Sequence, residues 1–306
     1  MLVRTGVLVL ILNLQAIVVR GEEGYAARVE QWRQGQESKL KSESGWLTLV
    51  GLHWLRPGVM LIGSDPTCDV VLPSSAPPQV GDLTVKDGRA TLQLVPGVAI
   101  TRNGQPFSGG EVHTDAGGKA DELALGALRL LVLKRGERYA LRVKDNASRL
   151  RATFAGLKWY PVDASWRIRG RFEPSTTPMR LVLDTIVGEQ ESFESPGHVV
   201  FERDGKVYWL QAAREGNHLW FVFRDGTSGR TTHAGARSLL SDLPDATGQV
   251  VLDFNKAVNL PCAYTPYATC PLAPRQNRLG LAITAGERLY DPSSAPAAKA
   301  PPGAAR

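Results

Sequence analysis

Two short apolar runs, Val207-Tyr-Trp-Leu-Gln-Ala-Ala213 and His218-Leu-Trp-Phe-Val-Phe223, lie on either side of the polar tripeptide Glu215-Gly216-Asn217. Short runs of this kind, bounded by turn residues, are typical of β-strands. The tripeptide supplies the glycine and asparagine that tight turns favour. This stretch therefore predicts two strands joined by a turn, and it indicates a β fold for the region around it.

The same signal recurs along most of the chain. Hairpin-type dipeptides stand beside alternating or apolar runs at Asp87-Gly88, Asn103-Gly104, Asp204-Gly205 and Asp225-Gly226. Strands of this length and spacing indicate sandwiches or barrels. We predict a mainly β protein with one β-sandwich over residues 46–148. A second antiparallel sandwich or barrel-like domain is predicted over 149–290, with a short helical or irregular insert at 234–243.

One helix is expected before the first strand. Tyr25, Val29 and Trp32 recur at helical spacing and share a face, which predicts a helix within residues 22–45. Trp46-Leu-Thr-Leu-Val50 follows it and is typical of a buried strand.

The two ends of the chain indicate export and a loose tail. A positive charge at Arg4, an apolar run over 7–19 and a polar flank are typical of a secretory signal peptide, here residues 1–21. No later segment is apolar enough to span a membrane. Residues 291–306 are mostly Pro, Ala, Ser and Gly and are expected to be disordered. We expect a periplasmic or secreted protein.

The chain has three cysteines, and two of them lie in one loop. In an oxidising compartment such cysteines usually pair, so we predict a Cys262–Cys270 disulfide, with Thr265-Pro266-Tyr267 reversing the chain between them. Cys68 is expected to be a small buried side chain. A thiol-redox role for Cys262 and Cys270 remains the alternative.

Positive charge is concentrated in one part of the sequence. The net charge is +6, and residues 134–171 contain eleven Lys or Arg against three Asp or Glu. By strand periodicity Arg138, Arg142 and Lys144 share one face, and so do Arg167, Arg169 and Arg171. If the two strands are neighbours, six cations lie on one surface. That surface would suit phosphate or carboxylate groups. The alternative is that these residues are solvated and paired with nearby carboxylates.

A second polar group lies near the end of the chain. Asp253 and Asn255 alternate along one strand end and face the same way, so with Asn259 they could form a polar pocket or simply brace the cysteine loop that follows. Paired carboxylates such as Glu189 and Glu191 can perform acid–base chemistry. The five histidines show no metal-ligand spacing, so no metal and no cofactor is expected.

The first β block contains motifs of a known sandwich. Gly63-Ser-Asp-Pro-Thr-Cys-Asp-Val-Val-Leu72 and Ile100-Thr-Arg-Asn-Gly-Gln-Pro-Phe107 resemble the scaffold motifs of forkhead-associated domains. Members of that family are β-sandwiches that bind phosphothreonine. This chain has Ser64 where that family has Arg, and Pro-Ser-Ser-Ala-Pro-Pro follows Leu72 where the family has Ser-x-x-His. The resemblance therefore implies the sandwich without phosphothreonine binding.

A second resemblance extends from about Trp32 to Glu287. It is carried by the following pieces: Gly45-Trp-Leu-Thr-Leu-Val-Gly-Leu-His-Trp-Leu55, Arg142-Val-Lys-Asp145, Phe223-Arg-Asp-Gly-Thr-Ser-Gly229, Asp253-Phe-Asn255, Pro261-Cys262, Cys270-Pro-Leu272, Asn277-Arg-Leu279 and Ala285-Gly-Glu287. Together they closely resemble the bacterial and archaeal domain-of-unknown-function family sixteen-eighty-four. His233 and Val258 depart from the pattern, which would have a tyrosine and an aromatic residue there. The resemblance implies no reaction, cofactor or partner.

These observations lead to three hypotheses about function. The first is an exported, non-catalytic module that binds an anionic envelope ligand or a protein partner through Arg138, Arg142, Arg167, Arg169, Arg171, Asp253 and Asn255; nucleic acid is not expected as a partner. The second is a hydrolase with a polar site near Asp253, Asn255 and Glu189. The third is a thiol-redox protein that uses Cys262 and Cys270. The oligomeric state stays open.

Overall fold

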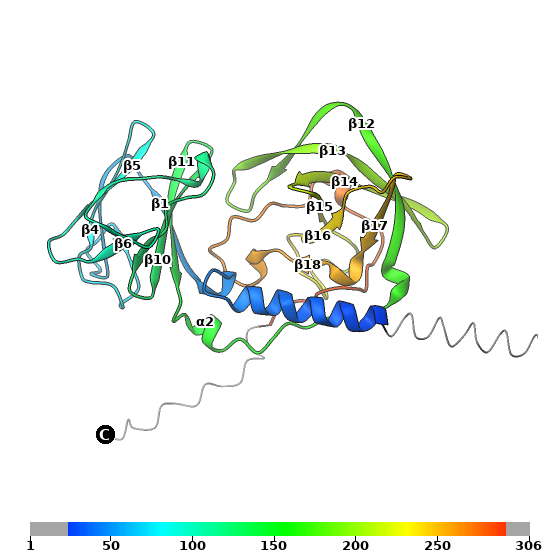
Figure 1. Cartoon of the computed structure of the whole chain (residues 1–306), viewed down its shortest axis with the longest axis horizontal. Helices are drawn as coiled ribbons and strands as arrows, with labels where there is room; N and C mark the ends of the chain where they lie inside the picture. The colour runs from blue at the N-terminus through cyan, green and yellow to red at the C-terminus, as the bar shows by residue number, and fades with distance from the viewer. Residues whose placement is uncertain (1–23, 292–306) are drawn as a thin grey trace, which may run out of the picture.

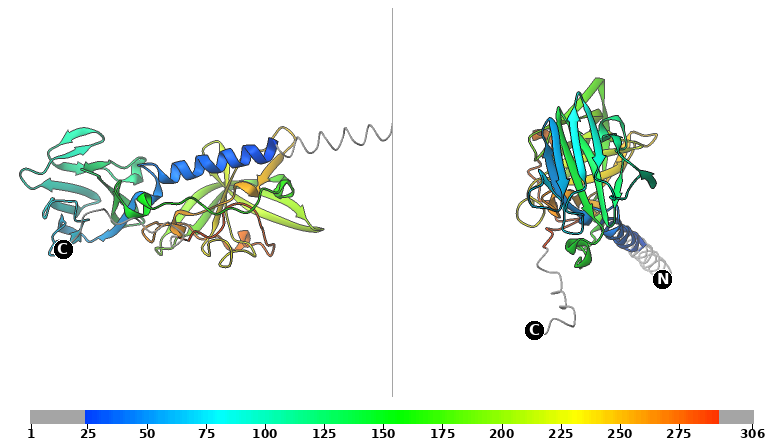
Figure 2. Two further views of the ribbon diagram at one scale, coloured as in Figure 1. Left: turned by 90° about the horizontal axis from the view of Figure 1, so that it is seen from below. Right: turned by 90° about the vertical axis from the view of Figure 1, so that its left-hand side faces the viewer.

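The computed structural model describes residues 24–291, and these form two β domains joined by a helix on one side (Figure 1). The predicted signal peptide (residues 1–21) and all of the predicted tail except Asp291 lie outside the described residues. Residues 24–41 are helical, which confirms the N-terminal helix. Figure 2 shows this helix running along the second domain, on the long side of the molecule.

The first domain is a sandwich of two sheets. One sheet has the strand order β1-β11-β10-β9-β6-β7 and the other the order β3-β2-β4-β5-β8. All pairings are antiparallel except β2 with β3. The strands are β1 (Leu49–Leu55), β2 (Gly58–Gly63), β3 (Val70–Val71), β4 (Gly81–Lys86), β5 (Arg89–Leu94), β6 (Ile100–Arg102), β7 (Gln105–Phe107), β8 (Gly110–Val112), β9 (Leu123–Leu125), β10 (Leu128–Arg135) and β11 (Arg138–Asp145).

The sandwich forms because its strands alternate between buried and exposed positions. Leu83, Val85, Leu92, Leu128 and Leu130 point into one continuous core between the two sheets. The turns between the strands follow the predicted chemistry. Asp87 and Asn103 have positive φ angles of 50° and 51°, as the two-residue turns of tight hairpins require.

The second domain contains one antiparallel sheet with the order β17-β12-β13-β14-β15-β16-β18. This sheet curls around a core that includes Phe221, Phe223 and Phe254 without closing into a barrel. Its strands are β12 (Arg167–Asp184), β13 (Gln190–Arg203), β14 (Lys206–Glu215), β15 (His218–Phe223), β16 (Arg237–Asp242), β17 (Gln249–Asp253) and β18 (Val258–Asn259). The mainly antiparallel β fold is therefore confirmed, and so is the turn between β14 and β15.

Short helical turns connect these strands. The chain passes from the first domain to the second through α2 (Arg149–Ala152). The 3₁₀ turns are η1 (Trp46–Thr48), η2 (Asp115–Gly117), η3 (Ala164–Trp166), η4 (Phe254–Lys256), η5 (Pro261–Ala263) and η6 (Arg275–Asn277). The strand expected from Trp46 therefore begins at Leu49, because the first three residues form a turn.

Two further local predictions were wrong. The expected helical or irregular insert at 234–243 contains strand β16, which pairs with β15 over its whole length. Its sequence, Arg-Ser-Leu-Leu-Ser-Asp, has no strict alternation, and cross-strand pairing decides its conformation. Asp225-Gly226 does not form a hairpin. Asp225 instead accepts hydrogen bonds from the backbone and hydroxyl of Thr227, which makes a local turn.

The N-terminal helix is attached to the second domain through its predicted face. Val29 is fully buried, and the ring of Trp32 meets that of Trp159 at a centroid distance of 6.1 Å. The Tyr25 hydroxyl donates to Asp253 Oδ1 at 2.6 Å and accepts from Asn255 Nδ2 at 2.9 Å. These contacts join the start of the helix to the end of β17.

Removing the Tyr25 hydroxyl tests this attachment. Tyr25→Phe leaves Asp253 and Asn255 without their shared partner, so we expect a loss of about 1–2 kcal/mol in the free energy of unfolding, measured by urea titration. Tyr267→Phe is the matched control, because the side chain of Tyr267 is exposed and its hydroxyl makes no hydrogen bond within residues 24–291. Equal stability of the two variants would show that the helix does not depend on this contact.

Candidate functional site

Two cysteines and a histidine meet where the loop after β18 returns towards β16. Cys262 lies in η5, and its Sγ is 3.2 Å from Nε2 of His233. The backbone N–H of Cys262 donates to Sγ of Cys270 at 3.1 Å. We call Cys262, His233 and Cys270 the thiol cluster. It is built from two segments far apart in the sequence, and Cys262 is half-buried while Cys270 is buried.

The predicted disulfide is wrong in this structure. Cys68, Cys262 and Cys270 are all free cysteines. The loop reverses without a covalent bridge because η5 begins at Pro261 and Thr265 Oγ1 donates to the carbonyl oxygen of Leu49 at 3.1 Å. Cys68 is buried in the first domain, as predicted.

The two thiols of the cluster are electrostatically unequal. A hydrogen bond from Cys270 and the neighbouring His233 lower the pKa of Cys262 to about 5, against the opposing effect of burial. The hydrogen bond to Cys262 and burial raise the pKa of Cys270. At neutral pH the pair is therefore one thiolate and one thiol, and the thiolate is the nucleophilic form of cysteine.

A glycine makes room for the Cys262–His233 contact. A Cβ atom at Gly235 would lie 3.0 Å from Nε2 of His233 and 4.0 Å from Sγ of Cys262. A side chain at this position would press against the imidazole edge that faces the sulfur.

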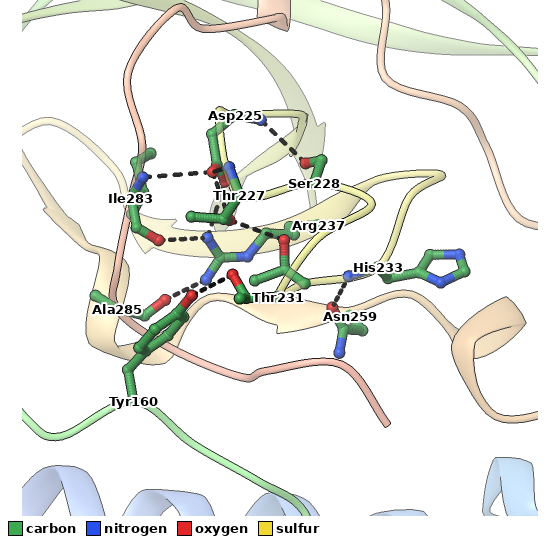
Figure 3. A network of polar contacts seen from close by, with 11 residues as sticks. Tyr160, Asp225, Thr227, Ser228, Thr231, His233, Arg237, Asn259, Ile283 and Ala285 are labelled. Carbon is green, nitrogen blue, oxygen red and sulfur yellow. Dashed lines mark hydrogen bonds and ion pairs between the residues drawn. The ribbon is translucent and has the colours of Figure 1, made fainter. Parts of the chain in front are cut away.

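A buried ion pair supports the loop that carries His233 (Figure 3). Arg237 on β16 is fully buried and its Nη1 lies 2.9 Å from Oδ2 of Asp225. The same guanidinium donates to the backbone oxygens of Ile283, at 3.2 Å, and Ala285. Asp225 Oδ1 accepts from the backbone and hydroxyl of Thr227 at 2.7 and 2.6 Å. The ion pair thus joins β16, the turn after β15 and the C-terminal segment.

Beside the ion pair lies a buried carboxylate. Glu287 is fully buried and accepts from the Tyr264 hydroxyl at 2.6 Å, and from the backbone and side-chain nitrogens of Asn259 at 2.9 Å each. Burial raises the pKa of Glu287 to about 7, although these hydrogen bonds act in the opposite direction. Asn259 Oδ1 also accepts from the backbone N–H of His233 at 3.2 Å, so Asn259 connects the carboxylate to the thiol cluster. It does not orient the imidazole ring in the manner of a catalytic triad.

Gly286 allows this carboxylate to reach its partners. Its φ of +80° favours glycine, and a Cβ atom there would lie 2.4 Å from the backbone oxygen of Ala257. The Ala285-Gly286-Glu287 motif therefore has a structural reason for its glycine.

A cavity of about 390 Å³ adjoins the cluster. It lies between the N-terminal helix, the turn that follows it and the loop after β18. Asn259, Pro261, Tyr264 and Glu287 form one wall, and Lys39, Ser44 and Trp46 are among the residues opposite. Cys262 itself is not in the lining, although Pro261 and Tyr264 on either side of it are. A second cavity of about 510 Å³ continues along the helix and shares Lys39 and Ser238 with the first.

The predicted six-cation surface does not form. Arg138 and Arg142 lie on β11 in the first domain, whereas Arg167, Arg169 and Arg171 lie on β12 in the second. The hypothesis required the two strands to be neighbours, and the domain boundary separates them. Arg138 pairs with Glu189 at 3.1 Å and lies over Trp54. Arg171 pairs with Glu173 at 2.5 Å, while Arg167 and Arg169 are exposed.

The predicted polar pocket of Asp253, Asn255 and Glu189 does not form either. Asn255 is fully buried and bonded to the backbone N–H and C=O of Asp163, while Asp253 accepts from Tyr25. These two residues brace the N-terminal helix and the start of β12. Glu189 lies between β12 and β13, where it bonds to Arg138. The joint site fails because the residues occupy different ends of the second domain.

Several residues of the site were not singled out as site residues from the sequence. They are His233, Arg237, Tyr264 and Glu287, whereas the sequence already grouped Asn259 with Asp253 and Asn255. Of these, only Glu287 stood in a quoted motif, and His233 was noted as a departure from the family pattern. The sequence gives little further indication of these site residues, because a lone histidine or arginine does not show which distant residue it will contact.

The described part of the chain shows neither a metal site nor a spanning helix. Within residues 24–291, no group of three or more His, Cys, Asp and Glu side chains could hold a metal ion. Among the same residues, no helix has the length and apolar character needed to cross a bilayer.

The buried carboxylate predicts a pH-dependent stability. The folded chain holds the Glu287 proton more tightly than the unfolded chain does. In the unfolded chain this carboxyl group has its ordinary pKa of 4.5. The stability contributed by this group is thus full below pH 4.5 and is lost as the pH rises to about 7. Glu287→Gln has no such proton to lose. As the pH rises from 4.5 to about 7, the free energy of unfolding of wild type should fall by about 3 kcal/mol more than that of the variant, as measured by urea titration.

The exposed Glu202 provides the control for this measurement. Glu202→Gln should show the same pH dependence as wild type, because its carboxylate is solvated. If Glu287→Gln also follows wild type over this range, the carboxylate does not titrate as its burial requires.

Comparison with known proteins identifies the second domain. The family described as "Protein of unknown function (DUF1684)" matches residues 152–288, so the pieces of the resemblance before Asp145 lie outside the matched region. The solution NMR structure of the uncharacterized protein from gene locus rrnAC0354 of Haloarcula marismortui is 31% identical. It covers 45% of this chain and 78% of its own, with a TM-score of 0.39.

A second similar solved structure is that of a forkhead-associated (FHA) domain, the family that the first β block was expected to resemble. It is titled a structural and functional analysis of phosphothreonine-dependent FHA domain interactions. It is 18% identical and covers 32% of this chain and 96% of its own, with a TM-score of 0.21. No curated protein matches the chain. Residues 152–288, which contain the whole thiol cluster, match the DUF1684 family of proteins of unknown function.

Proposed function

We propose that this protein carries out thiol–disulfide exchange, with Cys262 as the attacking thiolate and Cys270 as the resolving thiol. The observation that supports this best is the 3.2 Å contact of Cys262 Sγ with His233 Nε2, beside a second thiol whose sulfur accepts from the Cys262 backbone. A histidine next to a half-buried cysteine stabilises the thiolate. The nearby Cys270 can complete a two-step exchange.

The reaction balances as follows. The Cys262 thiolate attacks one sulfur of a substrate disulfide RSSR, forms a Cys262–SR mixed disulfide and releases RS⁻. Cys270 then attacks the Cys262 sulfur, a Cys262–Cys270 bond forms, and the second RS⁻ leaves. The proton of the Cys270 thiol passes to one leaving group and solvent protonates the other, because Cys262 starts as a thiolate. The protein loses two electrons, and one RSSR becomes two RSH.

Export is a separate part of the proposal. It rests on the signal-like sequence of residues 1–21. In an oxidising compartment the Cys262–Cys270 pair would spend most of its time oxidised, and the protein would then donate its disulfide rather than accept one. Cell fractionation with and without these residues tests this part.

The anionic-ligand and hydrolase hypotheses have weaker support. Arg138 and Arg171 already have carboxylate partners, and Arg167 and Arg169 lie on the other domain from Arg142. Asp253 already accepts a hydrogen bond from Tyr25, and Asn255 already accepts one from the backbone of Asp163. A general anion-binding surface would therefore have to rely on isolated residues.

Alkylation measures the thiolate directly. The rate of Cys262 alkylation by iodoacetamide, followed by peptide mass spectrometry, should be half-maximal near pH 5, because only the thiolate reacts. His233→Asn should move this midpoint upward by about 1–2 pH units, since it removes the neighbouring charge and hydrogen bond. His218→Asn is the control, because His218 is the first residue of β15 and pairs with Asp242 at the far end of β16 from His233. A wild-type midpoint near pH 9 would contradict the assignment.

Trapping of the intermediate tests the exchange itself. Cys270→Ser should accumulate a stable mixed disulfide at Cys262 when treated with 2-hydroxyethyl disulfide, whereas wild type should pass on to the internal disulfide. Cys262→Ser should form neither product. Cys68→Ser should behave as wild type, because Cys68 is buried in the other domain. If Cys270→Ser forms no adduct, or Cys262→Ser still reacts at the same rate, the proposed function is wrong.

A further inference from the structure

One arginine at the junction of the two domains lacks an anionic partner. Arg142 extends from β11, and its guanidinium makes no hydrogen bond or ion pair within residues 24–291, while its Nε is buried. Its neighbours on the same face, by contrast, have anionic partners. Arg135 pairs with Asp115 at 2.7 Å and Glu191 at 3.3 Å, and Arg138 pairs with Glu189. A desolvated guanidinium is costly unless it is paired, so this one is suited to an incoming anion.

Arg142 is placed beside the thiol cluster. Its guanidinium lies 5.3 Å from the ring centre of Trp46, and Trp46 packs in the same apolar cluster as Cys262 and Cys270. The positive charge of Arg142 also acts to lower the pKa of Cys270. The first domain thus contributes a cation to a site whose sulfur atoms come from the second.

The adjoining cavity reaches Trp46 but is not lined by Arg142 itself, and its charged lining residues are Lys39 and Glu287. Trp46, Ser44 and Lys39 all line it. The ammonium of Lys144 donates to the backbone oxygen of Ser44 at 2.7 Å and lies 6.0 Å from the Trp46 ring. Lys39 makes no ion pair in the part of the chain that the structure describes. The acids nearest to Arg142, Asp115 and Glu191, are already bonded to Arg135.

We propose that Arg142 binds a carboxylate of the exchange substrate, which is therefore a small, carboxylate-bearing disulfide or its thiol. This inference rests on the proposed thiol–disulfide exchange. The planar fork of a guanidinium matches a carboxylate and can hold it by two hydrogen bonds. The cavity of about 390 Å³, which is lined by the neighbouring Trp46 and not by Arg142, is in the size range of small-molecule sites.

A series of disulfides of different charge tests the substrate class. At equal ionic strength, wild type should exchange with 3,3′-dithiodipropionate about tenfold faster than with the neutral 2-hydroxyethyl disulfide, and slowest with cationic cystamine. Arg142→Gln should reduce the ratio of the first rate to the neutral rate to about one. Arg142→Lys should restore part of the difference, because it keeps the charge without the fork. Arg138→Gln, on the same strand but with Glu189 as its partner, should preserve the wild-type ratio.

Binding is measured separately from exchange, in the non-reacting Cys262→Ser protein. Calorimetric titration with 3,3′-dithiodipropionate should show binding that weakens at least tenfold when Arg142→Gln is added, with folding checked by circular dichroism. Absence of binding, or equal binding with and without Arg142, overturns this inference whatever the exchange rates are. Absence of exchange with every disulfide, combined with Arg142-dependent binding, overturns only the proposed function.

Discussion

The ion pair between Arg237 and Asp225 is the interaction on which the rest of the second domain depends. Both side chains are completely withdrawn from water, which costs several kcal/mol per charge unless the charges are paired and hydrogen-bonded. Here Asp225 also accepts from Thr227, and Arg237 also donates to the backbone at Ile283 and Ala285. Removing either partner would leave a buried charge without compensation. The pair therefore joins three segments, in addition to the backbone hydrogen bonds between them.

The position of the thiol cluster follows from that arrangement. Because Arg237 holds the backbone of Ala285, Gly286 can turn and place the Glu287 carboxylate against Asn259. Asn259 in turn accepts from the backbone of His233, at the end of the loop that Asp225 begins. The imidazole then lies next to Cys262. A rigid, buried network thus positions a half-buried sulfur, which is the arrangement that a preorganised reactive group requires.

The sequence predicted the parts of this protein that depend on local signals. The N-terminal helix, the hairpins at Asp87-Gly88, Asn103-Gly104 and Asp204-Gly205, and the turn at Gly216 each rest on residues a few positions apart, and the structure contains them. The errors concern long-range pairing. Nothing in the spacing of the arginines shows that β11 and β12 belong to different sheets, and nothing near Cys262 indicates His233. The disulfide prediction failed because it rested on an expected compartment, whereas the observed contact is set by tertiary packing.

The two domains supply different residues to the candidate site. The reacting sulfur atoms come from the second domain, and the proposed substrate-binding residue comes from the first. The family match begins at residue 152, so the cysteines, His233 and the ion pair belong to the matched region, whereas Arg142 and Trp46 do not. Thr265 holds the cysteine loop to the backbone of Leu49, and Arg138 holds Glu189, so the first domain is fixed against the sulfur atoms. A chemistry that resides in the second domain would then acquire its substrate selectivity from the first. In that arrangement, substitutions at the junction change which molecule reacts, while substitutions around Arg237 change whether the thiolate exists.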